Sequence, residues 1–104
     1  MTVTIKIEVM NGHYHAQDVI VKSGDVLEVQ NNVTGMDFLI AIQNKDQLIN
    51  AANLISETVA SGNTKTIGTV NAGPALIREY NIYPTSSSTT TPGTDAPPRI
   101  IRVS

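Results

Sequence analysis

Residues 19–32 read Val-Ile-Val-Lys-Ser-Gly-Asp-Val-Leu-Glu-Val-Gln-Asn-Asn, and this stretch decides the fold class. Val19–Lys22 and Val26–Gln30 are rich in β-branched residues and alternate in polarity, as half-buried strands do. The turn-forming residues Ser23–Asp25 separate them, and Gly24 can adopt a positive φ at low steric cost. The stretch therefore predicts a β-hairpin in a β-sandwich.

Further strands follow the same period-two pattern along the chain. They are predicted at residues 3–10, 36–43, 64–70, 75–83 and 99–103. The period changes only once, where Leu48, Ala51, Ala52 and Ile55 recur at helical spacing after the capping residue Asn44. The pattern predicts an all-β, two-sheet β-sandwich of about seven strands with one short helix near residues 44–56.

Length and composition predict one domain spanning residues 1–104 with an aliphatic core. Of the 104 residues, 40 % are hydrophobic and only 4 % aromatic, so valine, isoleucine, leucine and alanine must fill the interior. Residues 84–98 consist almost entirely of serine, threonine, proline and glycine. This segment is too polar to be buried and too long for a simple turn, which predicts a flexible loop.

Charge and cysteine content exclude several classes of function. Charged residues make up 15 % of the chain, the net charge is −2, and the lysines and arginines are scattered, so nucleic acid is not an expected partner. The absence of cysteine removes disulfides and thiolate chemistry. No apolar run is long enough to span a membrane. The high content of threonine, serine and asparagine favours an extracellular, periplasmic or virion-associated protein.

The layout resembles that of the cupredoxins, the small copper-protein sandwiches. Val19, Val21, Gly24, Asp25 and Leu27, followed by the asparagine pair, match the family segment I-x-V-x-x-G-D-x-V-x-F-x-N. An aliphatic strand, a helix, a tyrosine-bearing strand and a closing strand follow in the family order. The resemblance covers roughly residues 3–103 and implies a Greek-key sandwich.

The same alignment implies that the copper site of the family is missing. A type 1 copper site needs two histidines, a cysteine thiolate and usually a weak axial methionine. Met36 stands where the first histidine is expected, and Ile82 or Tyr83 stands where the cysteine is expected. The resemblance therefore implies a copper-free member, with no cofactor, that acts through protein contacts or as a structural subunit.

His13 and His15 are the candidate metal ligands. In an extended segment, residues i and i+2 point to one side, so both imidazoles are able to meet one divalent ion, with Asp18 or Met36 as a further ligand. Two histidines alone fall short of the three or four ligands that a zinc site requires. A solvated loop is the competing interpretation of this segment.

No catalytic residues are predicted, because neither the carboxylates nor the serines form a recognisable catalytic motif. The candidate contact residues lie at one end of the sandwich and are Tyr14, Asn32, Thr34, Met36, Tyr83 and Pro84. They predict a non-catalytic module that binds a protein partner or self-associates. Two alternatives stay open: a metal-handling domain that uses His13 and His15, and a structural protein of a virus or an extracellular filament.

Overall fold

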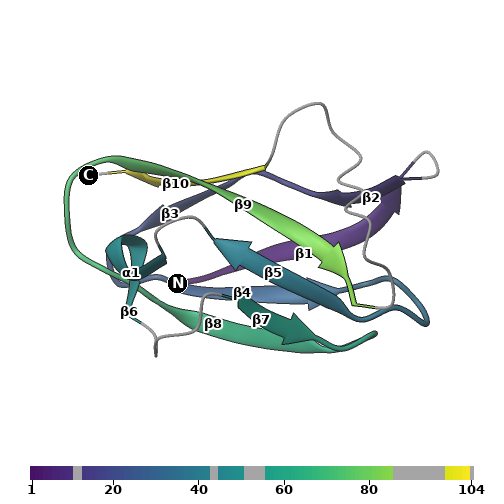
Figure 1. Cartoon of the computed structure of the whole chain (residues 1–104). Coiled ribbons are helices and arrows are strands. Elements are labelled where there is room, and N and C mark those ends of the chain that lie inside the picture. The colour runs from purple at the N-terminus through teal and green to yellow at the C-terminus, as the bar shows by residue number, and fades with distance from the viewer. Residues whose placement is uncertain (11–12, 43–44, 51–55, 86–97, 104) are drawn as a thin grey trace.

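Two five-stranded sheets pack face to face in the computed structural model (Figure 1). The structure describes residues 1–10, 13–42, 45–50, 56–85 and 98–103. The elements are β1 (Thr2–Met10), β2 (His13–Ala16), β3 (Val19–Lys22), β4 (Val26–Asn31), β5 (Phe38–Ile42), α1 (Lys45–Leu48), β6 (Ile49–Asn50), β7 (Ser56–Val59), β8 (Thr64–Val70), β9 (Leu76–Pro84) and β10 (Arg99–Val103).

The strand order identifies two sheets, named sheet A and sheet B below. Sheet A has the order β2-β1-β4-β8-β6, and sheet B has the order β3-β10-β9-β5-β7. Two neighbouring pairs are parallel, β1 with β4 and β3 with β10, and the other pairs are antiparallel. The all-β sandwich prediction is confirmed, and each of the seven predicted strands is present.

The predicted hairpin at residues 19–32 is wrong, because its two strands belong to different sheets. β3 pairs with β10, whereas β4 lies between β1 and β8. The turn crosses from one sheet to the other, with Gly24 at a φ of 89°. The Asp25 carboxylate accepts a hydrogen bond from the Lys22 backbone N–H at 2.9 Å. Gly24 and Asp25 also exchange backbone hydrogen bonds with Val70 at the end of β8.

The core is aliphatic, as the composition predicts, and is built from alternate residues of both sheets. Val19 and Val21 of β3 are buried from one side, and Leu27 and Val29 of β4 are buried from the other. Complete burial of one such side chain stabilises the fold by roughly 1.5–3 kcal/mol. Phe38 and Tyr80 are the two largest fully buried side chains.

Three further strands correct the sequence prediction. β2 occupies residues that were expected to form a loop, and its register with β1 pairs Ile7 with Ala16. The helix expected near residues 44–56 is reduced to Lys45–Leu48 within the described residues. The chain then joins sheet A as β6, where Ile49 pairs with Val70, and β7 begins at Ser56. Pairing with β8 satisfies the backbone and buries Ile49, which overrides the helical spacing.

The structure describes only the two ends of the segment that is predicted to form a flexible loop. Pro84 is the last residue of β9 and is buried, and Pro98 is buried beside β10. The Pro98 carbonyl accepts a hydrogen bond from the Tyr80 N–H. Residues 86–97 of the predicted loop lie outside the described part of the chain.

Arg102 of β10 is a buried cation held by main-chain carbonyls. Its side chain is 4 % exposed. Nε donates to the Pro74 carbonyl at 3.0 Å, and Nη1 donates to the carbonyls of Gln47 at 3.2 Å and Asn71 at 3.1 Å. A Cβ atom on Gly73 would lie 2.6 Å from Nη2 of Arg102. The guanidinium therefore joins α1, the β8–β9 connection and β10.

Candidate functional site at the loop end of the sandwich

Several predicted contact residues meet at the end of the sandwich formed by residues 31–37, 60–63 and 83–85, named the loop end below. Phe38 pairs with Pro84 on one side and with Val59 on the other, which brings the three segments together. Tyr14 of β2 reaches the same end, where its ring packs edge-on against Phe38 with centroids 5.1 Å apart. These contacts bring Tyr14 and Pro84 to one end of the sandwich, and the role of this end in binding stays a prediction.

Asn31 organises this end from a fully buried position at the end of β4, where it is 0 % exposed. Its amide nitrogen donates to the Met36 carbonyl at 2.7 Å and to the Val59 carbonyl at 3.1 Å. Its amide oxygen accepts from the Val33 N–H at 2.9 Å. Both donors and the acceptor of one side chain thus fix the 31–36 loop against β7. A buried polar group with all its partners rigidifies its surroundings.

Ser61 and Asp37 form a second link across the loop end. The Ser61 hydroxyl accepts from the Gly35 N–H at 2.9 Å and donates to the Val33 carbonyl at 2.8 Å. The Asp37 carboxylate accepts from the Ser61 N–H at 2.9 Å. The Asp37 carbonyl in turn accepts from the Thr85 N–H at 2.9 Å. Side chains and backbone of three separate segments therefore hold one another in place.

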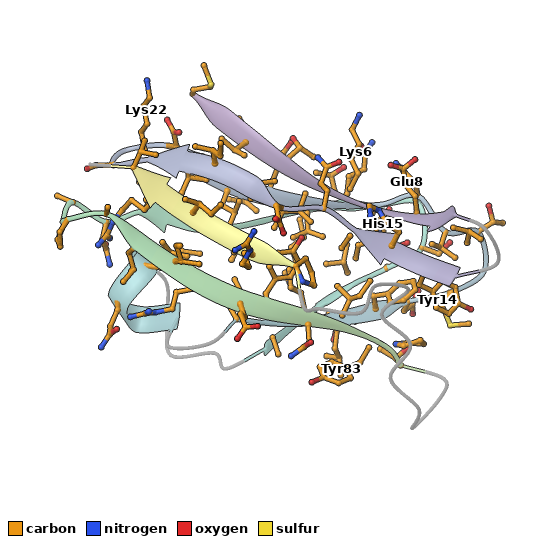
Figure 2. All side chains as sticks on the ribbon, turned by 90° about the horizontal axis from the view of Figure 1, so that it is seen from above. Lys6, Glu8, Tyr14, His15, Lys22 and Tyr83 are labelled. Carbon is orange, nitrogen blue, oxygen red and sulfur yellow. The ribbon has the colours of Figure 1, made fainter. Side chains whose placement is uncertain are left out.

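The predicted contact residues differ in their exposure. Asn32 and Thr34 are exposed on the fixed loop, and Met36 is half-buried against the core. Tyr14 is also half-buried, because its ring covers Phe38. Tyr83 lies on the outer face of sheet B, at a distance from Tyr14 (Figure 2). Pro84 is buried and offers no contact surface. Asn32 and Thr34 are therefore the accessible part of the predicted set.

The candidate metal ligands lie on an edge strand of sheet A. The β1–β2 register places His15 directly opposite Glu8 and pairs His13 with Met10. Figure 2 shows Lys6, Glu8 and His15 gathered on one side of the molecule. Among the residues whose side chains the structure describes, no three histidine, cysteine, aspartate or glutamate side chains lie close enough together to hold a metal ion.

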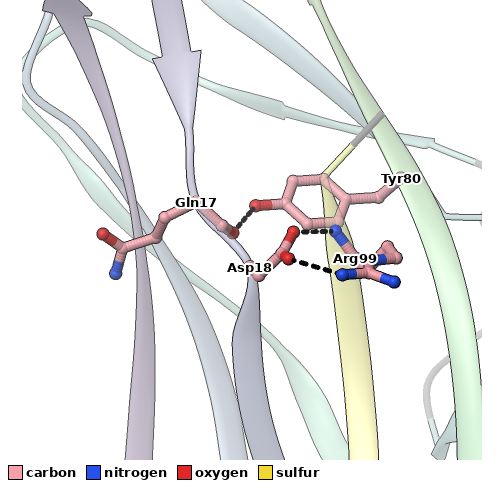
Figure 3. Close-up of polar contacts among 4 residues, drawn as sticks. All are labelled: Gln17, Asp18, Tyr80 and Arg99. Atoms are coloured by element: carbon pink, nitrogen blue, oxygen red, sulfur yellow. Dashed lines mark hydrogen bonds and ion pairs between the residues drawn. The ribbon is translucent and has the colours of Figure 1, made fainter. Parts of the chain in front are cut away.

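Asp18, the carboxylate expected beside the histidines, interacts with Arg99 instead (Figure 3). One carboxylate oxygen accepts from the Arg99 N–H at 2.8 Å, and the other lies 3.2 Å from Nη2 of Arg99. Next to this pair, the Tyr80 hydroxyl donates a hydrogen bond to the Gln17 carbonyl. Burial raises the pKa of Tyr80 well above its ordinary value, and the negative charge of Asp18 adds to the effect.

The raised pKa of Tyr80 predicts a loss of stability at high pH. Below pH 10 the phenol is protonated in both the folded and unfolded states and contributes no pH dependence. Above pH 10 only the unfolded phenol ionises, so the free energy of unfolding from this group falls by roughly 1.4 kcal/mol per pH unit. Urea unfolding from pH 8 to pH 11 should show this decline, and Tyr80→Phe should reduce its slope. Identical slopes in the two proteins would contradict the prediction.

Sequence reasoning missed the two side chains that organise the loop end. In the sequence, Asn31 is only one half of an asparagine pair, and no motif marks Ser61. Asp37 lies directly before the apolar strand β5, and its carboxylate accepts a hydrogen bond from the Ser61 N–H. The signal that was present is a carboxylate directly before an apolar strand, which needs a polar partner when the strand is buried.

Comparison with known proteins supports the fold and goes no further. No family model and no curated protein matches the sequence. Among solved structures, a variant of the McoA multicopper oxidase from the hyperthermophile Aquifex aeolicus matches 100 % of this chain with a TM-score of 0.55 and 13 % sequence identity. The chain spans about a quarter of that oxidase, 27 % of its length. By fold, the protein is a cupredoxin-like β-sandwich.

The described part of the chain contains no helix that is long and apolar enough to cross a membrane.

Proposed function

We propose that the protein is a non-catalytic, copper-free cupredoxin-like module that binds a protein partner through its loop end. The observation that carries the proposal is the Asn31 network. It fixes the backbone of a loop whose Asn32 and Thr34 side chains remain exposed. A binding loop held in one conformation loses little entropy on association. Loops placed on a rigid sandwich are also the usual site of contacts in such folds.

The residues at the family's copper positions do not fit a type 1 copper ion. The chain contains no cysteine, so the thiolate that defines such a site is absent from the sequence. Ile82 is an apolar core residue that is 2 % exposed, and Met36 packs against the core. In the proposed function, the side chains at these positions pack in or against the core and take no part in electron transfer.

Site-specific photo-crosslinking tests the proposed contact surface. A photoreactive amino acid placed at Thr34 should give a discrete adduct in cells that naturally produce the protein. The same amino acid at Thr66, an exposed threonine of β8 in sheet A, is the matched control and should give none. A ladder of adducts of the chain with itself would favour the structural-protein alternative. Equal labelling from both positions, or none from Thr34, would overturn the loop end as the contact surface.

The metal-handling alternative gains one specific observation, the cross-strand pair of His15 and Glu8. A carboxylate opposite an imidazole supplies two ligand types that divalent ions accept. Glu8 replaces Asp18 as the candidate oxygen ligand, because Asp18 is paired with Arg99. Calorimetric titration with zinc or copper tests this alternative. Binding that is lost in the His13→Ala/His15→Ala double variant would support it, and unchanged uptake would end it.

A further inference from the structure

The outer face of sheet B carries an apolar row that the proposed function does not use. Ile101 of β10 is paired with Ile20 of β3 on one side and with Ile77 of β9 on the other. The three residues are named the isoleucine row. Ile20 is 65 % exposed and Ile77 is 52 % exposed, and Val103, two residues beyond Ile101, is 39 % exposed. Ile101, between them, is partly buried. Three adjacent strands therefore carry isoleucine at the same level of the outer face.

Among the side chains that the structure describes, the outer face of sheet A carries no such row. Thr4 and Glu28, paired across β1 and β4, are joined there by a hydrogen bond of 2.7 Å. Thr66 and Thr69 of β8 are exposed on the same sheet. An antiparallel sheet with one solvated face normally alternates apolar and polar residues, as sheet A does. The isoleucine row breaks this rule on sheet B alone, and exposed apolar groups arranged side by side mark an interaction surface.

Charges flank the isoleucine row with opposite signs on its two sides. Two residues before Ile101 on β10, Arg99 lies between Asp18 and Glu79. These two carboxylates and one guanidinium together carry one net negative charge. On the other side, Val103 is paired with Lys22, which supplies one positive charge. The side chains of Asp18 and Arg99 are about half exposed, so both can face a partner.

We propose that this face binds a second copy of the chain through a twofold axis that runs along the isoleucine row. This rotation reverses the strand direction of the partner, so the Lys22 side of one copy lies over the Asp18 side of the other. A twofold axis parallel to the strands would instead place Asp18 over Glu79, which opposes like charges. Charge complementarity selects the first arrangement, in which each isoleucine meets its own counterpart. The isoleucine row contains no residue of the 31–37 segment, so the dimer would leave Asn32 and Thr34 accessible.

The small apolar area sets the expected strength of the dimer. An interface of three isoleucines and one valine per copy buries an area at the low end of the range for specific interfaces. Association through such small interfaces is weak and transient. A dissociation constant on the order of tens of micromolar is expected, which equals a binding free energy of about −6 kcal/mol. Sedimentation equilibrium from micromolar to millimolar protein should therefore show a monomer–dimer equilibrium. A strict monomer over the whole range would overturn the proposal.

Charged substitutions test the location of the interface. Ile20→Lys should abolish the dimer without unfolding the protein, because the side chain is 65 % exposed. Val9→Lys is the matched control, since Val9 is 56 % exposed on β1 of sheet A, and it should leave the dimer intact. Far-ultraviolet circular dichroism confirms that both variants are folded. Loss of the dimer in both variants, or in neither, would contradict the assignment to this face.

Crosslinking tests the direction of the twofold axis, because the chain contains no natural cysteine. Packed sheets lie about 10 Å apart, a gap that a short bismaleimide spans. Ile20→Cys should crosslink to itself under the proposed axis. Under the alternative axis, Ile20→Cys would instead crosslink to Ile77→Cys in a mixture of the two variants. Val9→Cys is the control and should stay monomeric. Crosslinking of Ile20→Cys only to Ile77→Cys would overturn the proposed arrangement.

Discussion

Replacing Asn31 with leucine should lower the free energy of unfolding by about 3–5 kcal/mol. Leucine has a similar size but removes both amide donors and the amide acceptor. The carbonyls of Met36 and Val59 would lose these hydrogen bonds, and so would the N–H of Val33. Each buried group left without a partner costs about 1–3 kcal/mol. Urea unfolding measures the change as a shift of the transition midpoint.

Asn32→Leu is the matched control for this prediction, because Asn32 is the exposed neighbour. Its stability should stay within about 0.5 kcal/mol of the parent protein, as is usual for surface substitutions. Hydrogen exchange separates a local from a global effect. In Asn31→Leu, the amide protons of Val33 and Gly35 should exchange faster than the difference in global stability explains, because the loop loses its anchor. A destabilisation below 1 kcal/mol would show that Asn31 is not the organising residue of the loop end.

The second large effect is expected at Arg102. Arg102→Met keeps an unbranched side chain of similar length but removes the donors to the Pro74, Gln47 and Asn71 carbonyls. A destabilisation of about 3–4 kcal/mol is expected. This is less than the full cost of three buried carbonyls without partners, because water can reach part of the vacated space. Thermal unfolding followed by circular dichroism measures the change. Arg99→Met is the control on the same strand, and loss of its half-exposed ion pair should cost at most about 1 kcal/mol.

Gly73 provides an independent test of the same contact. The added Cβ of Gly73→Ala meets Nη2 of Arg102 at 2.6 Å, and the guanidinium cannot move away without losing its hydrogen bonds. Overpacking of this kind costs about 1–3 kcal/mol. In the Arg102→Met background the same substitution should cost less, because the methionine side chain is more adaptable. Additive effects in this double-mutant cycle would contradict the proposed contact.

The sequence predicted the strands well because alternation depends only on which side chains face the core. It could not predict which strands pair, because alternation identifies a buried face and not a neighbour. The Ser23–Asp25 turn shows the difference. Its residues favour a turn both in a hairpin and in a connection between two sheets. In the folded protein, the buried faces of β3 and β4 place the two strands in opposite sheets. The predicted helix is present as α1, but it ends at Leu48 because Ile49 pairs with Val70 of β8.

The sequence predicted where the exposed loop lies, but not the hydrogen bonds that hold it. Position along the chain sufficed to place Asn32 and Thr34 on an exposed loop. The hydrogen bonds that fix this loop join residues far apart in sequence, 28 residues for Asn31 with Val59 and 24 for Asp37 with Ser61. Such partners cannot be chosen from one sequence, because many polar residues have the same bonding capacity. Pro84 was misplaced because its neighbours suggested a loop, whereas β9 continues through it.

The position of β10 has a consequence for how the protein is made. β10 lies between β3 and β9, so it is an interior strand of sheet B although its residues are synthesised after those of every other strand. Until residues 99–103 have left the ribosome, β3 has no neighbour in its own sheet, and β9 exposes the edge that β10 later covers. Contacts across such long sequence separations form slowly, and uncovered strand edges promote aggregation. Synthesis of this domain should therefore pass through a half-assembled state in which the edges of β3 and β9 are uncovered.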